Sequence, residues 1–394
     1  MRKLKKRRRW IAVLLTVSAC LLTFTGCWDN HELNTLFIVT GVGLDQEQDS
    51  DQIRISLEIG KAKAEQEESG KSPNPSIVFR TVSPTMMEGL STLDRDSSRN
   101  MLLQHNQVLL FGEDLAKKGI EEDIDWFVRD QESRMEVLVM VAAGKAEDVL
   151  SASLVQESIS GIYLSRMVQD LNRISPYYKV RMIDFVSRLR EETSAPVAPM
   201  VSLVDTGEEK KDIKLEGFAV FKHGKMIGRL NEKEMQSYVW SMGRTERCNV
   251  VSDTPEGSAV FHVKYLNVNT KVALSGEDRV TVSMEAEATL NVGQLRGFEG
   301  VSQQDFLPVL TKAAEEQIQR QIERTFQKAQ EMNADIYGIG TDISRKHPKQ
   351  WKEMKDRWDE IFPRIQLEVK TKVSIPGTGQ IVQSLKMEEG EHEN

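Results

Sequence analysis

The sequence predicts an α/β (mixed α+β) protein: a multidomain body of mixed sheets with packed helices, including one long helix in the C-terminal half. Strand-like and helix-like apolar patterns alternate through the first half of the chain. The second half combines alternating strands with the longest amphipathic segment. The 394 residues suffice for roughly two or three domains, and 39% hydrophobic with 28% charged residues is ordinary globular usage.

The first 26 residues have the pattern of a lipoprotein signal peptide. A basic stretch at 1–9 precedes the uncharged apolar run Trp10–Phe24, which is short for the roughly twenty residues of a membrane-spanning helix. Two small residues then lead into Cys27, as a lipoprotein signal peptidase requires, so we expect Cys27 to carry the lipid. Phe24 stands where Leu is usual. A secretory signal cut elsewhere and an uncleaved N-terminal anchor are the alternatives.

Three residues shortly after Cys27 are candidates for contact with a membrane or a partner. Trp28 could place its ring at the level of the lipid head groups, with the acidic Asp29 and Glu32 close behind it. Packing of Trp28 on the first domain is the alternative.

The net charge limits the class of partner. The whole chain carries −8 although its N-terminus is strongly basic, so the exported body is more acidic still. An acidic surface repels the phosphate backbone of nucleic acids and the anionic head groups of membranes. We therefore expect no nucleic-acid partner, and we expect attachment to any membrane to be covalent or hydrophobic.

The first domain is expected over residues 27–200. It opens with a hairpin, in which the buried strand Leu36–Leu44 and the half-exposed strand Ile53–Ile59 flank an acidic turn. The further elements are a loop at 60–77, a helix at Thr85–Asp96, a strand at Gln107–Phe111, an amphipathic segment at Glu113–Val128, a strand at Val137–Ala143 and a helix from Lys145. Such alternation of strands and helices predicts an α/β domain.

Residues 201–213 are predicted to be a linker, because prolines and the polar run Thr206–Lys211 interrupt the pattern there. The C-terminal α/β domain is expected over 214–378, and residues 379–394 are expected to be a charged tail. The predicted elements of this domain are a hairpin of Gly217–Phe221 and Met226–Leu230, strands at Ser258–Leu266 and Val280–Leu290, a long helix from Asp305 with Pro308 in its first turn, and a closing strand at Arg364–Ile375.

Several features have both a structural and a functional interpretation. The apolar stripe of the long helix is expected to pack on a sheet, with an oligomerising coiled coil as the alternative. Trp351 and Trp358 are expected on one side of a short helix in the core, with a partner contact as the alternative. His105 precedes a buried strand and is expected to make a structural hydrogen bond, with a ligand contact as the alternative.

No catalytic, cofactor or metal motif is recognisable in the sequence. The six histidines lack paired metal-ligand spacing, and Cys248 is the one cysteine beyond Cys27. The G-x-G pairs at 41–43 and 338–340 are weak signals, since glycine also serves turns and close packing. We therefore expect a non-enzymatic protein without catalytic residues, cofactor or metal, while a carboxylate pair assembled by folding stays open.

Blocks spread in order over nearly the whole mature chain are similar to those of one protein family. They are Gly26–Asp29, Glu32-Leu33, Phe37–Asp45 (FIVTGVGLD), Arg99–Ile120, Asp125–Asp130 (DWFVRD), Gly144–Leu150 (GKAEDVL), Glu216–Leu230, Ala334–Gly340 (ADIYGIG), Lys346–Trp351 and Trp358–Pro363 (WDEIFP). The ordered set resembles the Ger(x)C family of spore germination lipoproteins. Phe24 in the lipobox and the acidic tail after Lys386 depart from the family pattern.

The resemblance implies the lipoprotein C subunit of a three-part nutrient germinant receptor. Acyl chains on Cys27 would hold it on the outer face of the spore inner membrane, beside two integral membrane subunits of A and B type. It implies a multidomain body without catalytic activity. A small-molecule germinant is expected to be recognised mainly by the membrane subunits and not by this chain. A lipid-anchored extracytoplasmic solute-binding protein that captures the nutrient itself, and an envelope hydrolase, stay open as other classes.

Overall fold

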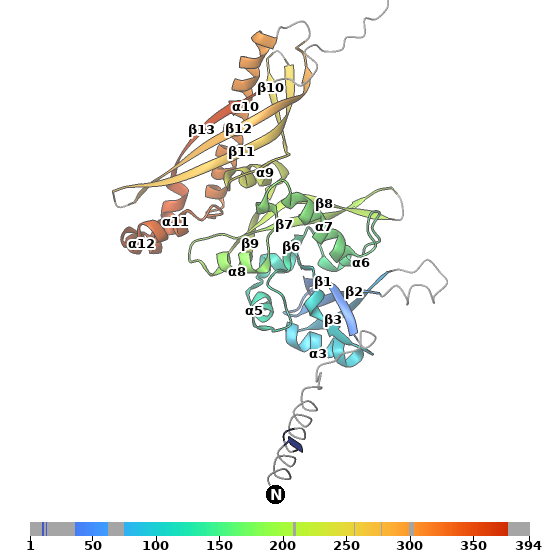
Figure 1. Ribbon diagram of the computed structural model, residues 1–394. Coiled ribbons are helices and arrows are strands. Elements are labelled where there is room, and N and C mark those ends of the chain that lie inside the picture. The colour runs from blue at the N-terminus through green and yellow to red at the C-terminus, as the bar shows by residue number, and fades with distance from the viewer. Residues whose placement is uncertain are drawn as a thin grey trace, which may run out of the picture.

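The structure is a computed structural model that describes residues 36–376 except 62–74, 208–209, 256, 277 and 299–302, together with residues 10, 11 and 13. The expected lipid site Cys27, the neighbouring Trp28, Asp29 and Glu32, and the charged tail lie outside the described residues. Among the helices that are described, none is long and apolar enough to cross a membrane. The body is elongated, with β1 to β3 and α3 at one pole and β10 at the other (Figure 1).

A large mixed sheet occupies the N-terminal half and extends beyond it. In the described part of the chain, nine strands join it in the order β3-β2-β1-β5-β6-β7-β8-β9, with β4 beside β1. Their bounds are β1 (Leu36–Gln46), β2 (Ile53–Gly60), β3 (Ser76–Ser83), β4 (Asn100–Leu102), β5 (Val108–Gly112), β6 (Leu138–Ala142), β7 (Val197–Asp205), β8 (Lys211–Lys222) and β9 (Lys225–Asn231). Strands β1, β5, β6 and β7 run parallel, and the remaining pairs along this order are antiparallel.

Helices cover both faces of the parallel part of this sheet, which is how parallel strands are usually buried. On one face lie α3 (Met86–Asp96), α4 (Glu113–Lys118), α5 (Glu121–Arg129) and α8 (Met182–Arg190). On the other face lie α6 (Ala146–Ser151) and α7 (Ser160–Asn172). Strand β2, predicted to be half-exposed, is therefore buried on both faces along most of its length.

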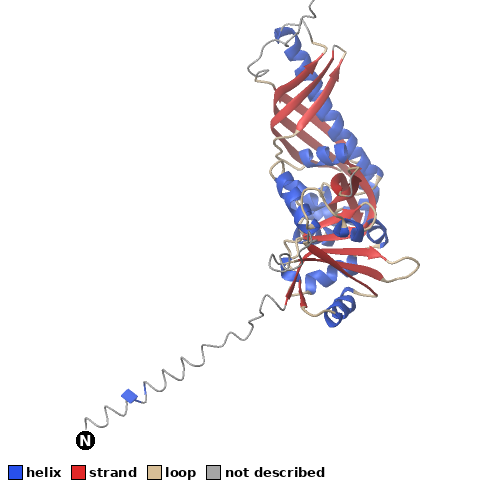
Figure 2. Ribbon diagram, turned by 90° about the vertical axis from the view of Figure 1, so that its right-hand side faces the viewer, coloured by secondary structure: helices blue, strands red, loops and turns tan. Residues whose placement is uncertain are grey.

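A second sheet of four described strands packs against the longest helix (Figure 2). It comprises β10 (Asn249–Thr254), β11 (Gly257–Ser275), β12 (Arg279–Arg296) and β13 (Gln366–Ser374), and only β13 runs parallel to its neighbour. The long helix is α10 (Gln303–Glu331), and the shorter helices are α9 (Glu232–Ser241), α11 (Ile339–Lys346), α12 (Pro348–Met354) and α13 (Trp358–Ile361). The apolar stripe of α10 lies in the sheet's core, which confirms the predicted packing on a sheet.

The two predicted hairpins are confirmed. Strands β1 and β2 pair antiparallel, and β8 and β9 are joined at His223 and Gly224. Both residues have positive φ, 47° and 68°, as a two-residue hairpin turn between right-twisted strands requires. The core interpretation of Trp351 and Trp358 is also confirmed, since their rings meet edge to face at 5.3 Å with Trp358 buried. They lie on two helices, α12 and α13, and not on the single short helix that was predicted.

The predicted linker at 201–213 is corrected by the structure. Residues 201–205 and 211–213 form the paired ends of β7 and β8, and β9 then adds a further strand, so the large sheet crosses the expected boundary. Of the polar run that suggested a linker, Thr206, Gly207 and Lys210 lie between the two strands, and Lys211 begins β8. Ile213 and Leu203 of this hairpin also pack in the apolar core beside α6 and α7.

Two helix boundaries also differ from the prediction. The segment Glu113–Val128 is split into α4 and α5, because Gly119 takes a φ of 138° and the N–H of Ile120 turns to donate to the carbonyl of Gly224 at 3.0 Å. Helix α10 begins two residues before its predicted start, so Pro308 lies in the second turn. There the missing N–H removes one hydrogen bond of the helix.

Candidate functional site at the domain junction

A buried carboxylate from a distant strand caps helix α7. The residue before the helix, Ile159, offers no side-chain cap. Glu58 of β2 replaces it: its carboxylate accepts the N–H groups of Ser160 at 2.6 Å and Gly161 at 2.8 Å, and the hydroxyl of Thr40 at 2.9 Å. Burial raises the pKa of Glu58, while the hydrogen bonds that its carboxylate accepts favour the charged form. The carboxylate thus satisfies helix N–H groups that would otherwise be buried without partners.

A second carboxylate fills the position where an open α/β sheet usually binds anions. Asp45 is the last buried residue of β1 and accepts the N–H of Ala146 at 2.7 Å and of Glu147 at 2.9 Å, at the start of α6. The N-cap residue Lys145 makes no side-chain cap. Burial raises the pKa of Asp45, opposed by these two N–H groups. Because the protein's own carboxylate occupies this helix N-terminus, no phosphate is needed to satisfy it.

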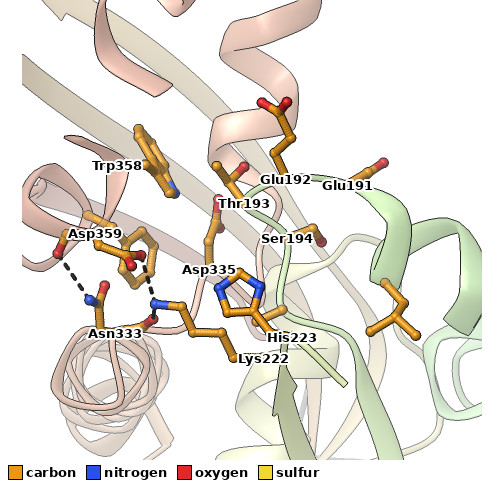
Figure 3. Close-up of a pocket in the computed structure, with 13 residues that line it drawn as sticks. Glu191, Glu192, Thr193, Ser194, Lys222, His223, Asn333, Asp335, Trp358 and Asp359 are labelled. Carbon is orange, nitrogen blue, oxygen red and sulfur yellow. Dashed lines mark hydrogen bonds and ion pairs between the residues drawn. The ribbon is translucent and has the colours of Figure 1, made fainter. Parts of the chain in front are cut away.

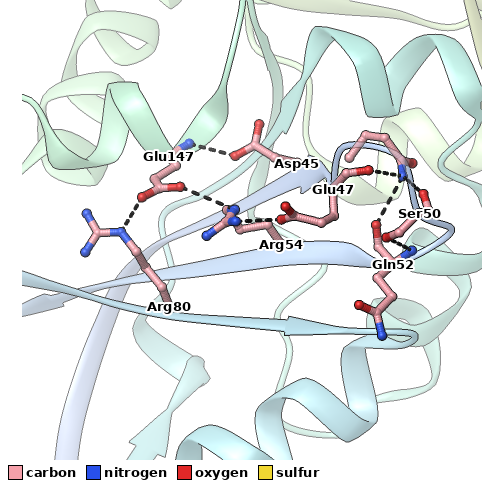
Figure 4. A network of polar contacts seen from close by, with 8 residues as sticks. Asp45, Glu47, Ser50, Gln52, Arg54, Arg80 and Glu147 are labelled. Carbon is pink, nitrogen blue, oxygen red and sulfur yellow. Dashed lines mark hydrogen bonds and ion pairs between the residues drawn. The ribbon is translucent and has the colours of Figure 1, made fainter.

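A network of ion pairs surrounds this cap (Figure 4). Arg54 pairs with Glu47 at 2.6 Å and lies 3.7 Å from Glu147, which also pairs with Arg80. These side chains are partly exposed, so water and salt weaken the pairs and each contributes little to stability. The network ties the β1–β2 hairpin and β3 to the start of α6.

A third buried carboxylate lies at the junction between the two sheets. Asp335 accepts the N–H of Ile339 at 2.9 Å and of Gly340 at 2.8 Å, and so caps α11. Burial raises the pKa of Asp335 to about 6, although the helix N–H groups and the nearby Arg188 oppose that rise. Gly338, which precedes the helix, has a φ of 70° that favours glycine. The G-x-G pair at 338–340 therefore marks a turn and a helix start.

Side chains from both halves of the chain are bonded across this junction. Arg188 of α8 donates to the hydroxyl of Tyr238 at 2.9 Å and to the carbonyl of Ile336 at 2.8 Å. Lys222, at the end of β8, donates to the carbonyl of Asn333 at 2.8 Å and to the carboxylate of Asp359 at 2.7 Å (Figure 3). The hydrogen bonds fix the second sheet and its helices against the edge of the large sheet.

The junction also encloses a small polar cavity. Its volume is about 20 Å³, room for about one water molecule. Three polar atoms on its lining residues are buried without a protein partner, namely the hydroxyl of Ser194, Oδ1 of Asn333 and Nε1 of Trp358. A larger groove of about 640 Å³ lies nearby, between α8, the start of β7 and the end of α9.

The candidate residues named from sequence take structural positions where the structure describes them. His105 is exposed, and the hydrogen bond it makes comes from its main-chain carbonyl, which accepts from Gln107 at 2.9 Å. Gly41 and Gly43 let α6 approach β1, since a Cβ at either would lie 2.9 Å from Leu150. The thiol of Cys248 is buried, which raises its pKa to about 11. Within the described residues, no group of three or more His, Cys, Asp or Glu side chains could hold a metal ion.

The three capping carboxylates were not identified from the sequence. One signal was available for Glu58, an acidic residue between Leu57 and Ile59, although it shares the polar positions of the alternating strand β2 with Arg54 and Ser56. Asp45 and Asp335 likewise adjoin buried apolar segments. A charge at such a position has to be paired or hydrogen-bonded, but the helix that it caps lies about a hundred residues away for Asp45 and Glu58.

Comparisons with known proteins agree with this architecture. Residues 29–203 match the family described as spore germination protein N-terminal domain, and residues 216–379 match spore germination B3/GerAC like, C-terminal. Spore germination protein KC of Bacillus subtilis (strain 168) is 26% identical, over 95% of this chain and 96% of that protein. Spore germination protein B3 of the same organism is 25% identical, over 87% of this chain and 91% of that protein.

A solved structure shows the same fold. The crystal structure of the GerBC protein aligns with a TM-score of 0.53 and 18% identity, over 89% of this chain and all of that one. The first family match ends within β7 and the second begins within β8 of the large sheet, and the relatives cover nearly the full length. The chain belongs to the Ger(x)C family of spore germination proteins.

Proposed function

We propose that this chain is the lipid-anchored, non-enzymatic C subunit of a nutrient germinant receptor on the outer face of the spore inner membrane. Its partners would be two integral membrane subunits of A and B type. The similarity to spore germination proteins over nearly the whole length is the observation that carries the proposal. The sequence around Cys27 supports the anchor, since a basic stretch, an apolar run and small residues precede it.

The anchor would place the large sheet nearest the bilayer. Leu36, the first residue of β1, follows Cys27 by nine residues, a stretch that spans at most about 30 Å when fully extended. The two or three acyl chains of a lipoprotein cysteine bind persistently, whereas one chain binds reversibly. Confinement near the membrane raises the effective concentration of the body for membrane partners, so a weak interface could still assemble.

Two features of the body fit a role in coupling the membrane subunits: its helix N-termini are filled, and its two sheets are joined by hydrogen bonds. Three helix N-termini, which could otherwise bind anionic substrates, are filled by Asp45, Glu58 and Asp335. Hydrogen bonds from Arg188 and Lys222 join the two sheets into one elongated unit. A body of this kind is suited to holding two partner surfaces at a set separation.

The direct test is affinity purification of the tagged full-length protein from detergent-solubilised spore inner membrane, with mass spectrometry of its partners. Recovery of two integral membrane subunits in comparable amounts supports the receptor proposal. Recovery of the lipoprotein alone, under conditions that preserve other membrane complexes, contradicts it and favours a free solute-binding protein.

Replacement of the predicted lipid site tests the anchor separately. Cys27→Ala should release the protein from the membrane fraction and reduce the germination response, because the acidic body has no electrostatic attraction to the bilayer. Cys248→Ala is the matched control, since Cys248 is buried in the body and should not affect fractionation. Normal germination and normal membrane fractionation of the Cys27→Ala protein would show that lipidation is not what localises it.

A further inference from the structure

The groove of about 640 Å³ has the size and position of a ligand site. Volumes of roughly 300–1,000 Å³ are typical of small-molecule pockets, which often lie between domains. Its apolar wall is formed by Phe185 of α8, Val197 of β7, and Tyr238 and Met242 at the end of α9. The first two residues belong to the N-terminal family match and the last two to the C-terminal match, so a bound molecule would touch both.

Three cations border this groove, and within the described residues Lys179 is the one whose side chain makes neither an ion pair nor a hydrogen bond. Arg181 donates to Asp184 at 2.7 Å and to Glu136 at 3.0 Å. Arg188 has no ion pair among the described residues either, but its guanidinium donates to a tyrosine hydroxyl and to a main-chain carbonyl. Lys179 has no ion pair within the residues that the structure describes. Its ammonium is therefore the charge left available to a ligand.

Lys179 also lines a second, polar cavity of about 150 Å³. Arg134 lines the same cavity and likewise has no ion pair in the described part of the chain. The acidic residue of this cavity, Glu136, is already held by Arg181. Lys179 thus lies where an apolar groove meets a polar space with a second unpaired cation.

The backbone around Lys179 is held in place without a ligand. The N–H of Val139 donates to the carbonyl of Val180 at 3.0 Å, and the N–H of Met182 donates to the carbonyl of Val137 at 2.8 Å. These bonds join the segment between α7 and α8 to the start of β6. A preformed wall of this kind reduces the entropy that a ligand loses on binding.

We propose that this groove binds an organic monoanion with an apolar body, with its carboxylate at Lys179 and its apolar part against Phe185 and Tyr238. The apolar wall favours a hydrocarbon or aromatic group, and the unpaired ammonium favours one negative charge. A free amino acid fits less well, because the nearby carboxylates Asp184 and Glu136 are already paired with Arg181. Its own ammonium group would lose water without gaining a partner.

Because the ligand would contact both matched regions, its binding would stabilise one arrangement of the junction. Binding needs no membrane subunit, so this proposal is independent of receptor assembly and has its own readouts.

The test is a titration of the full chain, purified in detergent, with phenylbutyrate. Thermal unfolding should shift to higher temperature with a saturable dependence on the concentration of the anion. The neutral analogue phenylbutyramide and the zwitterion phenylalanine should each need at least about tenfold higher concentration. The amide has no negative charge for Lys179, and the ammonium group of phenylalanine would lose water without gaining a partner.

Variants locate the binding site. Lys179→Ala should weaken phenylbutyrate binding about tenfold or more, and Lys179→Arg should retain most of it. Ser187→Trp should block binding, because Ser187 is an exposed residue of α8 that borders the groove. Lys352→Ala, at an exposed lysine of α12, is the matched control and should leave the affinity unchanged.

Three results would each overturn the proposal. They are the absence of saturable binding to the wild-type chain, equal affinity for the acid and its amide, and an unchanged affinity in the Lys179→Ala variant. Recovery of membrane subunits in the affinity purification is a separate measurement, so the failure of one proposal can be told apart from failure of the other.

Discussion

Removal of Glu58 tests whether a buried carboxylate maintains the start of α7. Glu58 is completely buried and accepts the N–H groups of Ser160 and Gly161 and the hydroxyl of Thr40. In the Glu58→Ala variant, alanine cannot reach these donors. The hydroxyl of Thr40 has a substitute, since it already lies 3.2 Å from the carbonyl of residue 58. The two helix N–H groups have none within α7 itself.

The expected loss follows from these two donors. A buried donor left without a partner costs about 1–3 kcal/mol. Burial raises the pKa of Glu58, so part of the loss is offset because the variant no longer buries a charge. We therefore expect the free energy of unfolding to fall by about 2–4 kcal/mol.

Urea unfolding followed by far-ultraviolet circular dichroism measures this change through the shift of the midpoint. Glu47→Ala is the matched control, because Glu47 lies just beyond β1, at the start of the β1–β2 turn, and its partly exposed carboxylate pairs with Arg54 at 2.6 Å. That variant should lose less than about 1 kcal/mol. Similar small losses in both variants would refute the idea that the buried carboxylate caps α7.

Three further predictions test the other buried contacts. Asp335→Asn should remove one component of the pH dependence of stability. Burial raises the pKa of Asp335 from 3.8 to about 6, so the stabilisation that this group contributes is fully present below about pH 4 and up to about 3 kcal/mol of it is lost as the pH rises through about 6. Urea unfolding of both proteins across this range checks it, and parallel curves would contradict it. Gly161→Ala should lower the unfolding free energy by about 2 kcal/mol, because the new Cβ would lie 2.3 Å from the carbonyl oxygen of Thr40. The cost of this clash outweighs the roughly 1 kcal/mol gain in helix propensity, and a raised melting temperature would contradict this. Lys222→Ala should cost about 1–2 kcal/mol and speed amide exchange at residues 333–335, measured by mass spectrometry, because its ammonium bonds Asn333 across the junction; unchanged exchange would contradict a role in fixing the junction.

Much of the secondary structure could be predicted from local patterns. The β1–β2 and β8–β9 hairpins follow from apolar runs separated by short polar turns, and α10 follows from its helical stripe. Helices α7, α8 and α9 were not indicated. Their apolar residues do recur at helical spacing, as Met182, Phe185, Val186 and Leu189 do in α8, but α7 starts beside Gly161 without a capping side chain of its own. Its stability comes from burial against the sheet and from Glu58.

The dependence of sequence prediction on local patterns also explains why the site residues were not identified. Glu58, Asp45 and Asp335 look like ordinary acidic residues in the sequence, because the N–H groups that Asp45 and Glu58 accept come from elements about a hundred residues away. The pairing of Arg188 with Ile336 spans a still longer separation. The groove at Lys179 is likewise built from segments that sequence patterns do not bring together.

By itself, the sequence determined the mixed α/β class, the position of most strands, the two hairpins, the long amphipathic helix and the family. Those features depend on interactions between residues close in the chain, or on motifs that can be matched directly. The tertiary structure alone decided the extension of the large sheet through β7 to β9, the burial of β2 on both faces, the capping carboxylates and the groove. These depend on strand pairing and helix packing between distant segments, whose free energy is realised only when the whole chain has folded.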